Sequence, residues 1–386
     1  MANNNDNKVL NVPHLRFPEF SGEWKMCTIG ELTTKVGSGV TPRGGEAVYK
    51  TEGHPFVRSQ NVGLGNLLLD DIAFIDEETH LRQKSTELQF NDVLLNITGA
   101  SIGRSALVDK QIVGGNVNQH VCIIRTKENL VPSFICSFLL SNYGQRQIDS
   151  FQAGGNRQGL NFEQIKSIKI TIPSKDEQIK IDKLLRAIDE RIATQNKIID
   201  KLQSLIKGLR VCCMQRNGSD NVYLSEIAQI YQPQTISSAE LTEDGFLVYG
   251  ANGIIGKYKD YNHKTEQICI TCRGNTCGMV NYTKPMSWIT GNAMVINTDK
   301  YQDKVYKKYL YHYLSAYNFN SIISGSGQPQ IVRTPLEKLK ITLPTISEQK
   351  QKAMILDKIQ DKIDINHNVL NLYILQKQYL LRQMFI

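Results

Sequence analysis

Apolar residues recur at spacings of three and four along two long stretches of the chain, with charged residues between them. This period is typical of an amphipathic helix, and over about five heptads it predicts a coiled-coil seam. The first seam consists of Ile181, Leu185, Ile188, Ile192, Ile199, Leu202, Ile206, Leu209 and Cys213. The second consists of Leu356, Ile359, Ile363, Leu370, Tyr373, Leu380 and Met384. It is the poorer seam, because Lys352 and Lys377 fall on it.

Both helices belong to a segment that occurs twice in the sequence. Residues 160–214 align with residues 331–385 without a gap, at a constant offset of 171 residues. An offset held over such a length indicates a duplicated unit. We therefore expect two equivalent halves, each consisting of a globular part followed by a long helix.

Each copy of the repeat begins with a short strand and a helix start. An alternating apolar run, residues 168–172 and 339–343, predicts a strand with one buried face, which a proline ends. Two capping boxes follow and mark where the helices begin. They consist of Ser174 with Glu177 and of Thr345 with Glu348.

Each seam contains one polar residue, and the two occupy the same point of the repeat. They are Gln195 and Asn366, which would meet if the helices paired along their full length and would then set the register. Only residues 215–220 separate the first helix from the second half, so the helices should run antiparallel. The predicted fold class is α+β: two globular mixed α/β domains separated by a long antiparallel two-helix coiled coil, with an internal pseudo-twofold repeat.

The globular halves are related but have diverged much more than the helices. A glycine loop, residues 99–103, follows an apolar strand in the first half and aligns with residues 274–278 in the second. We also align the Gly-Asn pair at 115–116 with the Gly-Asn pair at 291–292. A shared framework with different loops is typical of two modules that bind different versions of one kind of target.

The start of the chain and the repeated segment carry a resemblance to a known family. Residues 12–20 (VPHLRFPEF), Trp24, residues 29–32 (IGEL) and residues 39–42 (GVTP) resemble the start of the DNA-specificity subunit of type I restriction-modification systems. The repeated Ile/Leu-Pro-x-x-x-Glu-Gln, followed by a long helix, resembles the two central repeats of that family. The resemblance covers almost the whole chain.

The resemblance implies two target-recognition domains, each reading one half of a split duplex DNA sequence. The helices would be a spacer that docks two methyltransferase subunits, and ATP-dependent translocase/nuclease subunits would join for restriction. No cofactor is expected in this chain, and S-adenosylmethionine, ATP and Mg²⁺ are expected on the partner subunits. The implied organisation is a flexible tail (1–13), target-recognition domain 1 (14–173), a first spacer helix (174–215), target-recognition domain 2 (216–344) and a second spacer helix (345–386).

Loops that mix glycine with Arg, Asn, Gln, Ser and Thr supply the donors and acceptors that base edges and phosphates require. In the first half the candidate DNA-binding residues are Lys35, Ser38, Thr41, Arg43, Arg58, Gln60, Asn61, Ser101, Arg104, Asn118, Asn156, Arg157 and Gln158. In the second half they are Gln232, Gln234, Asn252, Lys257, Arg273, Asn275, Thr276, Gln328, Gln330 and Arg333. We favour the glycine loops 154–157 and 325–328, which lie at equivalent places. A turn-forming or solvated role stays open for each residue taken alone.

Composition adds a modest basic excess and excludes several classes of protein. Lys and Arg number 45 against 37 Asp and Glu, and the net charge of +8 is compatible with a polyanionic partner. Neither a long apolar run nor an apolar leader is present, so we expect no membrane span or signal peptide and a cytoplasmic protein. The eight cysteines are irregularly spaced, and we interpret them as reduced thiols.

No catalytic or metal centre is predicted in this chain. The Asn/Asp-Pro-Pro-aromatic motif of adenine methylation is missing, and no glycine loop has the setting of an S-adenosylmethionine pocket. Residues 251–258 resemble a phosphate-binding loop, but Ala and Tyr replace its first Gly and its Mg²⁺-binding hydroxyl. Cys269, Cys272 and Cys277 suggest zinc, but no clear fourth ligand lies nearby. We therefore expect a noncatalytic chain without a metal.

Apolar residues away from the two seams indicate that something else covers the helices. They are Leu184, Ile198, Leu205, Leu372, Ile374, Leu375, Tyr379 and Leu381. Two paired helices cannot bury all of them, so partner helices or the protein's own domains must do so. Two other functions stay open: the recognition region of a single-chain DNA methyltransferase or nuclease, and a coiled-coil scaffold with two protein- or glycan-binding heads.

Overall fold

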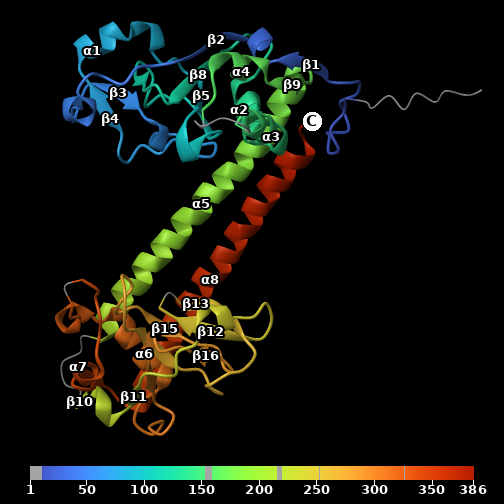
Figure 1. The fold of residues 1–386 in the computed structure, drawn as a ribbon. Helices are drawn as coiled ribbons and strands as arrows, with labels where there is room; N and C mark the ends of the chain where they lie inside the picture. The colour runs from blue at the N-terminus through green and yellow to red at the C-terminus, as the bar shows by residue number, and fades with distance from the viewer. Residues whose placement is uncertain (1–10, 153–158, 215–219, 252, 326) are drawn as a thin grey trace, which may run out of the picture. The chain divides into compact units, whose positions relative to one another are not determined.

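The computed structural model describes residues 11–152, 159–214, 220–251, 253–325 and 327–386. Its internal contacts divide the chain into two compact units. The first unit consists of Met1–Thr194 with Leu370–Ile386, and the second unit consists of Gln195–Val369. Each unit therefore contains one mixed α/β part and a part of each long helix (Figure 1).

Three small sheets form the α/β part of the first unit within the residues described. The two-stranded sheet pairs β1 (Lys25–Thr28) with β9 (Lys169–Ile172). The four-stranded antiparallel sheet has the order β2 (Thr33–Ser38), β8 (Val121–Thr126), β5 (Val93–Asn96) and β6 (Ser105–Leu107). The three-stranded sheet has the order β4 (Ala73–Ile75), β3 (His54–Val57) and β7 (Asn116–Val117). The helices are α1 (Glu77–Arg82), α2 (Pro132–Leu140), α3 (Asn142–Ser150) and α4 (Phe162–Ser167).

The second unit has the same three sheets in the part of it that is described. Its two-stranded sheet pairs β10 (Asp220–Tyr223) with β18 (Lys340–Leu343). Its four-stranded sheet has the order β11 (Gln229–Tyr231), β17 (Ala293–Asn297), β14 (Ile268–Thr271) and β15 (Val280–Tyr282). Its three-stranded sheet has the order β13 (Gly253–Tyr258), β12 (Phe246–Gly250) and β16 (Trp288–Ile289). The short helices are α6 (Lys307–Ala316) and α7 (Arg333–Glu337).

The central strands of the two four-stranded sheets, β5 and β14, divide their side chains between two cores. Val93 and Leu95 of β5 belong to the core that contains residues of α2, whereas Leu94 belongs to a separate core. In β14, Ile268 is likewise in one core and Cys269 in another. A continuous apolar run is expected for a strand that is buried on both faces. The two halves of the chain therefore share strand order, strand burial and core arrangement, as the duplication predicts.

The backbone pairing corrects one part of the sequence alignment. Both β7 and β16 run parallel to the middle strand of a three-stranded sheet, so Asn116 at the start of β7 corresponds to Trp288 at the start of β16. Asn292 corresponds instead to His120, because both carbonyls accept the equivalent backbone hydrogen bond at 3.0 Å. The alignment of Asn116 with Asn292 is therefore wrong. The same Gly-Asn dipeptide occurs in both halves, but at positions that are not equivalent in the strand pairing.

The two predicted long helices are α5 (Lys175–Met214) and α8 (Ile346–Gln383). In the first unit, one core contains residues of both helices: Ile181, Leu185, Ile188, Leu380 and Met384. In the second unit, another cluster also joins them: Leu202, Ile206, Leu209, Leu356, Ile359 and Ile363. Early residues of α5 thus contact late residues of α8 and the reverse, which makes the pair antiparallel. Gln195 Nε2 donates a hydrogen bond to Asn366 Oδ1 at 2.5 Å, so the two polar residues of the seams meet.

The glutamine of the repeated Glu-Gln pair makes the same hydrogen bonds in both repeats. Gln178 Oε1 accepts a hydrogen bond from the backbone N–H of Val131 at 2.8 Å, and its Nε2 donates to two backbone carbonyls. Gln349 makes the same three contacts, with the backbone N–H of Tyr306 at 2.7 Å. Because both glutamines are buried, each one ties a long helix to the segment that begins α2 or α6.

The capping boxes differ between the repeats. Glu348 accepts from the backbone N–H of Thr345 at 3.1 Å and its own N–H donates to Thr345 Oγ1 at 3.4 Å, as the capping motif predicts. At the start of α5, only the second of these bonds forms, from the Glu177 N–H to Ser174 Oγ at 3.4 Å. The Glu177 carboxylate instead binds Arg16, so this half of the predicted box is wrong.

His312 joins α6 to both long helices within the second unit. Arg210 Nε donates to His312 Nδ1 at 3.2 Å, and His312 Nε2 lies 3.0 Å from Asp357 Oδ1. A guanidinium can only donate, so Nδ1 must accept and the imidazole must be neutral, with its proton on Nε2. Burial lowers the pKa of His312, and the charges of Arg210 and Lys308 lower it further, against the opposite effect of Asp357.

The second unit is therefore expected to lose stability as the pH falls below about 6.5, the ordinary pKa of an exposed histidine. Below this pH the unfolded chain takes up a proton that the folded imidazole accepts only at its lower pKa. This group alone should lower the free energy of unfolding by up to about 1.4 kcal/mol per pH unit. His312→Gln can keep both hydrogen bonds without titrating, so it should show a weaker pH dependence. Urea unfolding near neutral pH and below pH 6 tests this, and equal pH dependence in both proteins would contradict it.

Candidate nucleic-acid interface

A glycine loop follows the central strand of each four-stranded sheet and begins and ends with a glycine in the left-handed region. The φ angles are 71° at Gly99 and 84° at Gly103 in the first unit, and 87° at Gly274 and 92° at Gly278 in the second. A side chain at these positions would be strained, which explains why both glycines occur in each loop. The loop framework is thus common to both units, and only the residues between the glycines vary.

In each unit, a hydroxyl of the glycine loop has an internal hydrogen-bond partner. In the first unit, Asn96 Nδ2 donates to Ser101 Oγ at 3.1 Å. In the second unit, the hydroxyls of Thr271 and Thr276 both donate to the carbonyl of Ala251, at 2.6 and 3.0 Å. Ser101 and Thr276 are candidate DNA-binding residues, and the structure gives both hydroxyls an internal partner. Their contact with DNA stays a prediction.

In the second unit, four candidate residues line one cavity of about 360 Å³. They are Gln232, Arg273, Gln330 and Arg333, and apolar residues such as Met294 and Ile331 form part of its wall. Arg273 and Gln330 come from chain segments that form an isolated antiparallel bridge with each other. A concave site with guanidinium and amide groups offers the donors and acceptors that recognise the edge of a base.

Three candidates of the first unit gather on one acidic residue. Arg58, Gln60 and Asn61 all donate to Asp71, and Asn61 does so at 2.9 Å from a fully buried position. Arg58 also lies 5.4 Å from the centre of the Tyr49 ring. These side chains organise their own loop, so their role in binding DNA stays a prediction.

Other candidates differ in how far their side chains are free to bind a ligand. Lys35 donates to the carbonyl of Ser85, and burial lowers the pKa of its ammonium group. Asn118 is buried, Lys257 lies 3.1 Å from Asp244, and Ser38 makes only a long contact to its neighbour's carbonyl at 3.5 Å. Several side chains make no hydrogen bond or ion pair with any described residue: Thr41, Arg43, Arg104, Gln234, Arg273, Asn275, Gln328 and Gln330.

Part of the candidate set lies outside the described residues. Asn156, Arg157 and Gln158, together with the rest of the glycine loop at 154–157, lie outside the described residues. Asn252 also lies outside them, as does residue 326 in the second glycine loop.

Two residues beside the glycine loop of the first unit were not among the sequence candidates. Thr98 Oγ1 lies 2.6 Å from His120 Nδ1, and both residues are half-buried. Thr98 forms an isolated bridge with Gly159, just as Arg273 does with Gln330 in the second unit. Gly159 and Gln330 are separated by the same 171 residues as the repeat, but that offset does not locate Thr98 or His120, so no sequence signal pointed to this pair.

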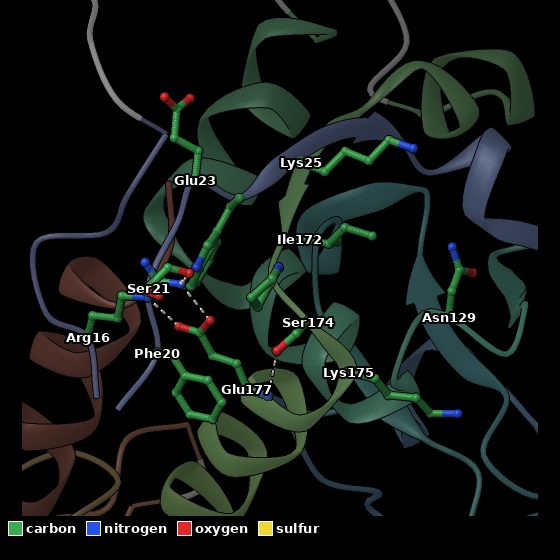
Figure 2. Close-up of a pocket in the computed structure, with 12 residues that line it drawn as sticks. Arg16, Phe20, Ser21, Glu23, Lys25, Asn129, Ile172, Ser174, Lys175 and Glu177 are labelled. Atoms are coloured by element: carbon green, nitrogen blue, oxygen red, sulfur yellow. Dashed lines mark hydrogen bonds and ion pairs between the residues drawn. The ribbon is translucent and has the colours of Figure 1, made fainter. Parts of the chain in front are cut away.

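A hollow of about 510 Å³ in the first unit has a structural role (Figure 2). Arg16 donates to both oxygens of the buried Glu177 carboxylate, at 2.8 and 2.9 Å. In Figure 2 the side chains of Lys25 and Lys175 point away from this ion pair. Because a buried carboxylate needs a partner of this kind, the contact holds the N-terminal segment against the start of α5.

The two motifs that resemble cofactor sites have other structures here. Residues Gly253–Tyr258 form β13, which is antiparallel to β12 and does not lead into a helix as a phosphate-binding loop would. Cys269 is fully buried, and burial raises its pKa to about 12. Within the described residues no group of three or more His, Cys, Asp and Glu side chains could hold a metal ion. Among these same residues, no helix has both the length and the apolar character that crossing a membrane requires.

Comparison with known proteins identifies the family. A model of the type I restriction modification DNA specificity domain matches residues 21–204 and, a second time, residues 217–372. The chain belongs to this family. The two matches follow the two repeated halves, so each half of this specificity-domain protein carries one copy of the family's domain.

Individual relatives and solved structures agree with the family assignment. The chain is 22% identical to the putative type I restriction enzyme MjaX specificity subunit of Methanocaldococcus jannaschii, over 93% of this chain and 92% of the relative. It is 32% identical to the EcoprrI specificity subunit of Escherichia coli over 35% of this chain and 34% of that protein. Its fold is similar to the S subunit of a type I restriction-modification system from M. genitalium, with a TM-score of 0.65 and 17% identity, covering 97% and 99% of the two chains.

Proposed function

We propose that this chain is the noncatalytic specificity subunit of a type I restriction-modification complex and that it binds a split duplex DNA sequence. Each α/β part reads one half of that sequence. The observation that carries the proposal is the repeated sheet framework with different side chains at equivalent loop positions, in a member of the specificity-domain family. Variable loops on a constant framework are where recognition usually resides.

The chemistry of methylation and cleavage is assigned to partner subunits in this proposal. The sequence has no motif for a flipped adenine and no S-adenosylmethionine loop, so a methyltransferase chain would supply both. ATP and Mg²⁺ would act on a translocase/nuclease chain. This chain contributes the choice of site and the placement of two methyltransferase subunits on it.

Apolar residues on α8 support a partner surface on the long helices. Leu372, Leu375 and Tyr379 lie in the first unit and are 65%, 59% and 58% exposed. Leu381, which was predicted to lie off the seam, packs partly against the core of the same unit. An apolar helix face of this kind is expected to be covered by another protein, and helices of the methyltransferase subunits would cover it.

Leu372→Asp together with Leu375→Asp is expected to weaken assembly with the methyltransferase subunits by at least roughly 100-fold, because each buried Leu contributes about 1.5–3 kcal/mol. Both side chains are exposed in the isolated chain, so its unfolding temperature should not change. Leu81→Asp is the matched control, because Leu81 is an exposed leucine of α1. Titration of the labelled chain with the methyltransferase subunit measures the affinity. Equal affinity of the double variant and the control would refute this surface.

The proposed function is tested by sequencing the methylome of cells that express this chain with its partner subunits. The expected result is methylation within one motif made of two half-sites separated by unread base pairs. Cells that express the partner subunits without this chain should lack that methylation. Methylation of a single uninterrupted motif, or of no motif, would contradict the proposal.

A further inference from the structure

The two units place a pair of side chains at one equivalent point of their sheets. In the first unit, the Ile97 N–H donates to the His120 carbonyl at 3.0 Å, and the Ile97 carbonyl accepts from the Leu160 N–H at 2.9 Å. In the second unit, Cys272 makes the same two bonds, with the Asn292 carbonyl and the Ile331 N–H, each at 3.0 Å. The backbone hydrogen bonding around Ile97 in the first unit is therefore the same as that around Cys272 in the second.

The side chains that this shared backbone presents are different. The residue after Ile97 is Thr98, and the residue after Cys272 is Arg273, so these two occupy one equivalent position. His120 and Asn292 occupy the other. The backbone positions are thus equivalent in the two units, and only the side chains on them differ. This arrangement is expected of residues that set specificity.

In the second unit the pair consists of a guanidinium and an amide that are both exposed. Arg273 has no hydrogen-bond or ion-pair partner among the described residues, and it lines the cavity with Gln232 and Gln330. An arginine can donate two hydrogen bonds to O6 and N7 of guanine, and an asparagine can bind N6 and N7 of adenine. The pair of Arg273 and Asn292 therefore suits a purine edge in the major groove.

In the first unit the pair consists of a hydroxyl and an imidazole that are already joined. The 2.6 Å contact from Thr98 Oγ1 to His120 Nδ1 restrains the ring, and Nε2 makes only a long contact of 3.4 Å with Gln119 Nε2 on the exposed side. This pair offers single hydrogen bonds and a methyl group, and it cannot make the bidentate contact of an arginine. The two units should therefore prefer different base pairs at this position.

We propose that Thr98 with His120 and Arg273 with Asn292 are the equivalent specificity-determining pairs of the two halves. The inference rests on the proposed DNA-binding function, and it names the residues that determine which base pair is recognised. Because each pair belongs to one unit, changing it should alter one position of one half-site and leave the other half-site unchanged.

The test gives the second unit the pair of the first, by Arg273→Thr together with Asn292→His, in the complete complex. Methylome sequencing should show that discrimination at one base pair of one half-site falls about 10- to 100-fold or changes to another base. Lys300→Ala is the control, because Lys300 is an exposed basic residue beyond the opposite end of β17 from Asn292. It should leave the motif unchanged.

Each outcome separates this inference from the proposed function. If the wild-type complex methylates a split motif and the double variant methylates the same motif with the same discrimination, the specificity pair is refuted while the function stands. If the wild-type complex methylates no split motif, the proposed function itself fails. If the double variant does not assemble, Arg273→Gln provides the same comparison, because a single change of an exposed side chain preserves the fold.

Discussion

The affinity of the assembled complex for DNA is expected to fall about 10³- to 10⁵-fold when the salt concentration rises from 50 to 200 mM. The net charge of this chain is only +8, which is enough for several phosphate contacts but too little for tight binding alone. Each phosphate that a Lys or Arg neutralises releases counterions, and added salt opposes that release. With about six to ten such contacts across the complex, the electrostatic part of binding should dominate its salt dependence.

Fluorescence anisotropy with a labelled duplex, repeated at several salt concentrations, gives the slope of log affinity against log salt. The isolated chain should bind much more weakly than the complex at every concentration. Arg273→Ala removes a base contact in our proposal, so it should lower specific affinity without reducing the binding of unrelated duplexes to the same extent. Tight binding by the isolated chain that does not respond to salt would refute the electrostatic account.

The helices could be predicted from the sequence because their physics is local and periodic. Burial of Ile181, Leu185 and Ile188 follows directly from spacings of three and four. The antiparallel direction followed from the short connection between the halves, and the Gln195–Asn366 contact followed from the equal position of both residues in the repeat. Such features require no knowledge of which distant segments come together.

Contacts between distant segments are what the sequence could not provide. Glu177 satisfies every requirement of a capping box, yet Arg16, 161 residues away, takes its carboxylate. No local pattern distinguishes these two outcomes. The repeated Gly-Asn dipeptide likewise suggested the wrong equivalent for Asn116. Only the pairing of β7 with β3 establishes which residue of the second unit corresponds to it.

In the candidate site, too, local features could be predicted from the sequence and contacts between distant segments could not. Glycine, arginine and amide residues in loops were the basis of the candidate set, and four such residues of the second unit line one cavity, while their contact with DNA stays a prediction. Composition could not tell an available side chain from one with an internal partner, as Asn61 shows by its contact with Asp71. Nor could it find Thr98 and His120, which are ordinary residues until the fold places them together.

Insertion of one heptad into α5 alone is expected to abolish assembly of the complex. The insertion, placed after Asp200, would separate the Gln195–Asn366 pair from the cluster that contains Ile206 and Leu356. Only one of these two contacts could then form. Loss of the other would expose an apolar seam or leave a polar residue without its partner, and either is costly. Size-exclusion chromatography with the methyltransferase subunit measures the loss.

A second heptad in α8 should restore assembly if it lies opposite the first. The position after Gln360 satisfies this condition, because it also lies between Asn366 and Leu356. The position that is equivalent in the repeat, after Asn371, lies on the other side of Asn366 and would still split the polar pair. The structure therefore makes a distinction between two double insertions that have the same length and composition. Only the first should assemble with wild-type affinity.

The double insertion after Asp200 and Gln360 should also change the DNA sequence that is methylated. Seven residues lengthen a helix by about 10 Å at 1.5 Å per residue, which corresponds to about three base pairs of DNA. If the paired helices set the distance between the reading domains, both half-sites should be retained and the gap between them should grow by about three base pairs. Methylome sequencing reads the gap directly. An active double insertion that methylates sites with the original gap would show that the helices do not set this distance.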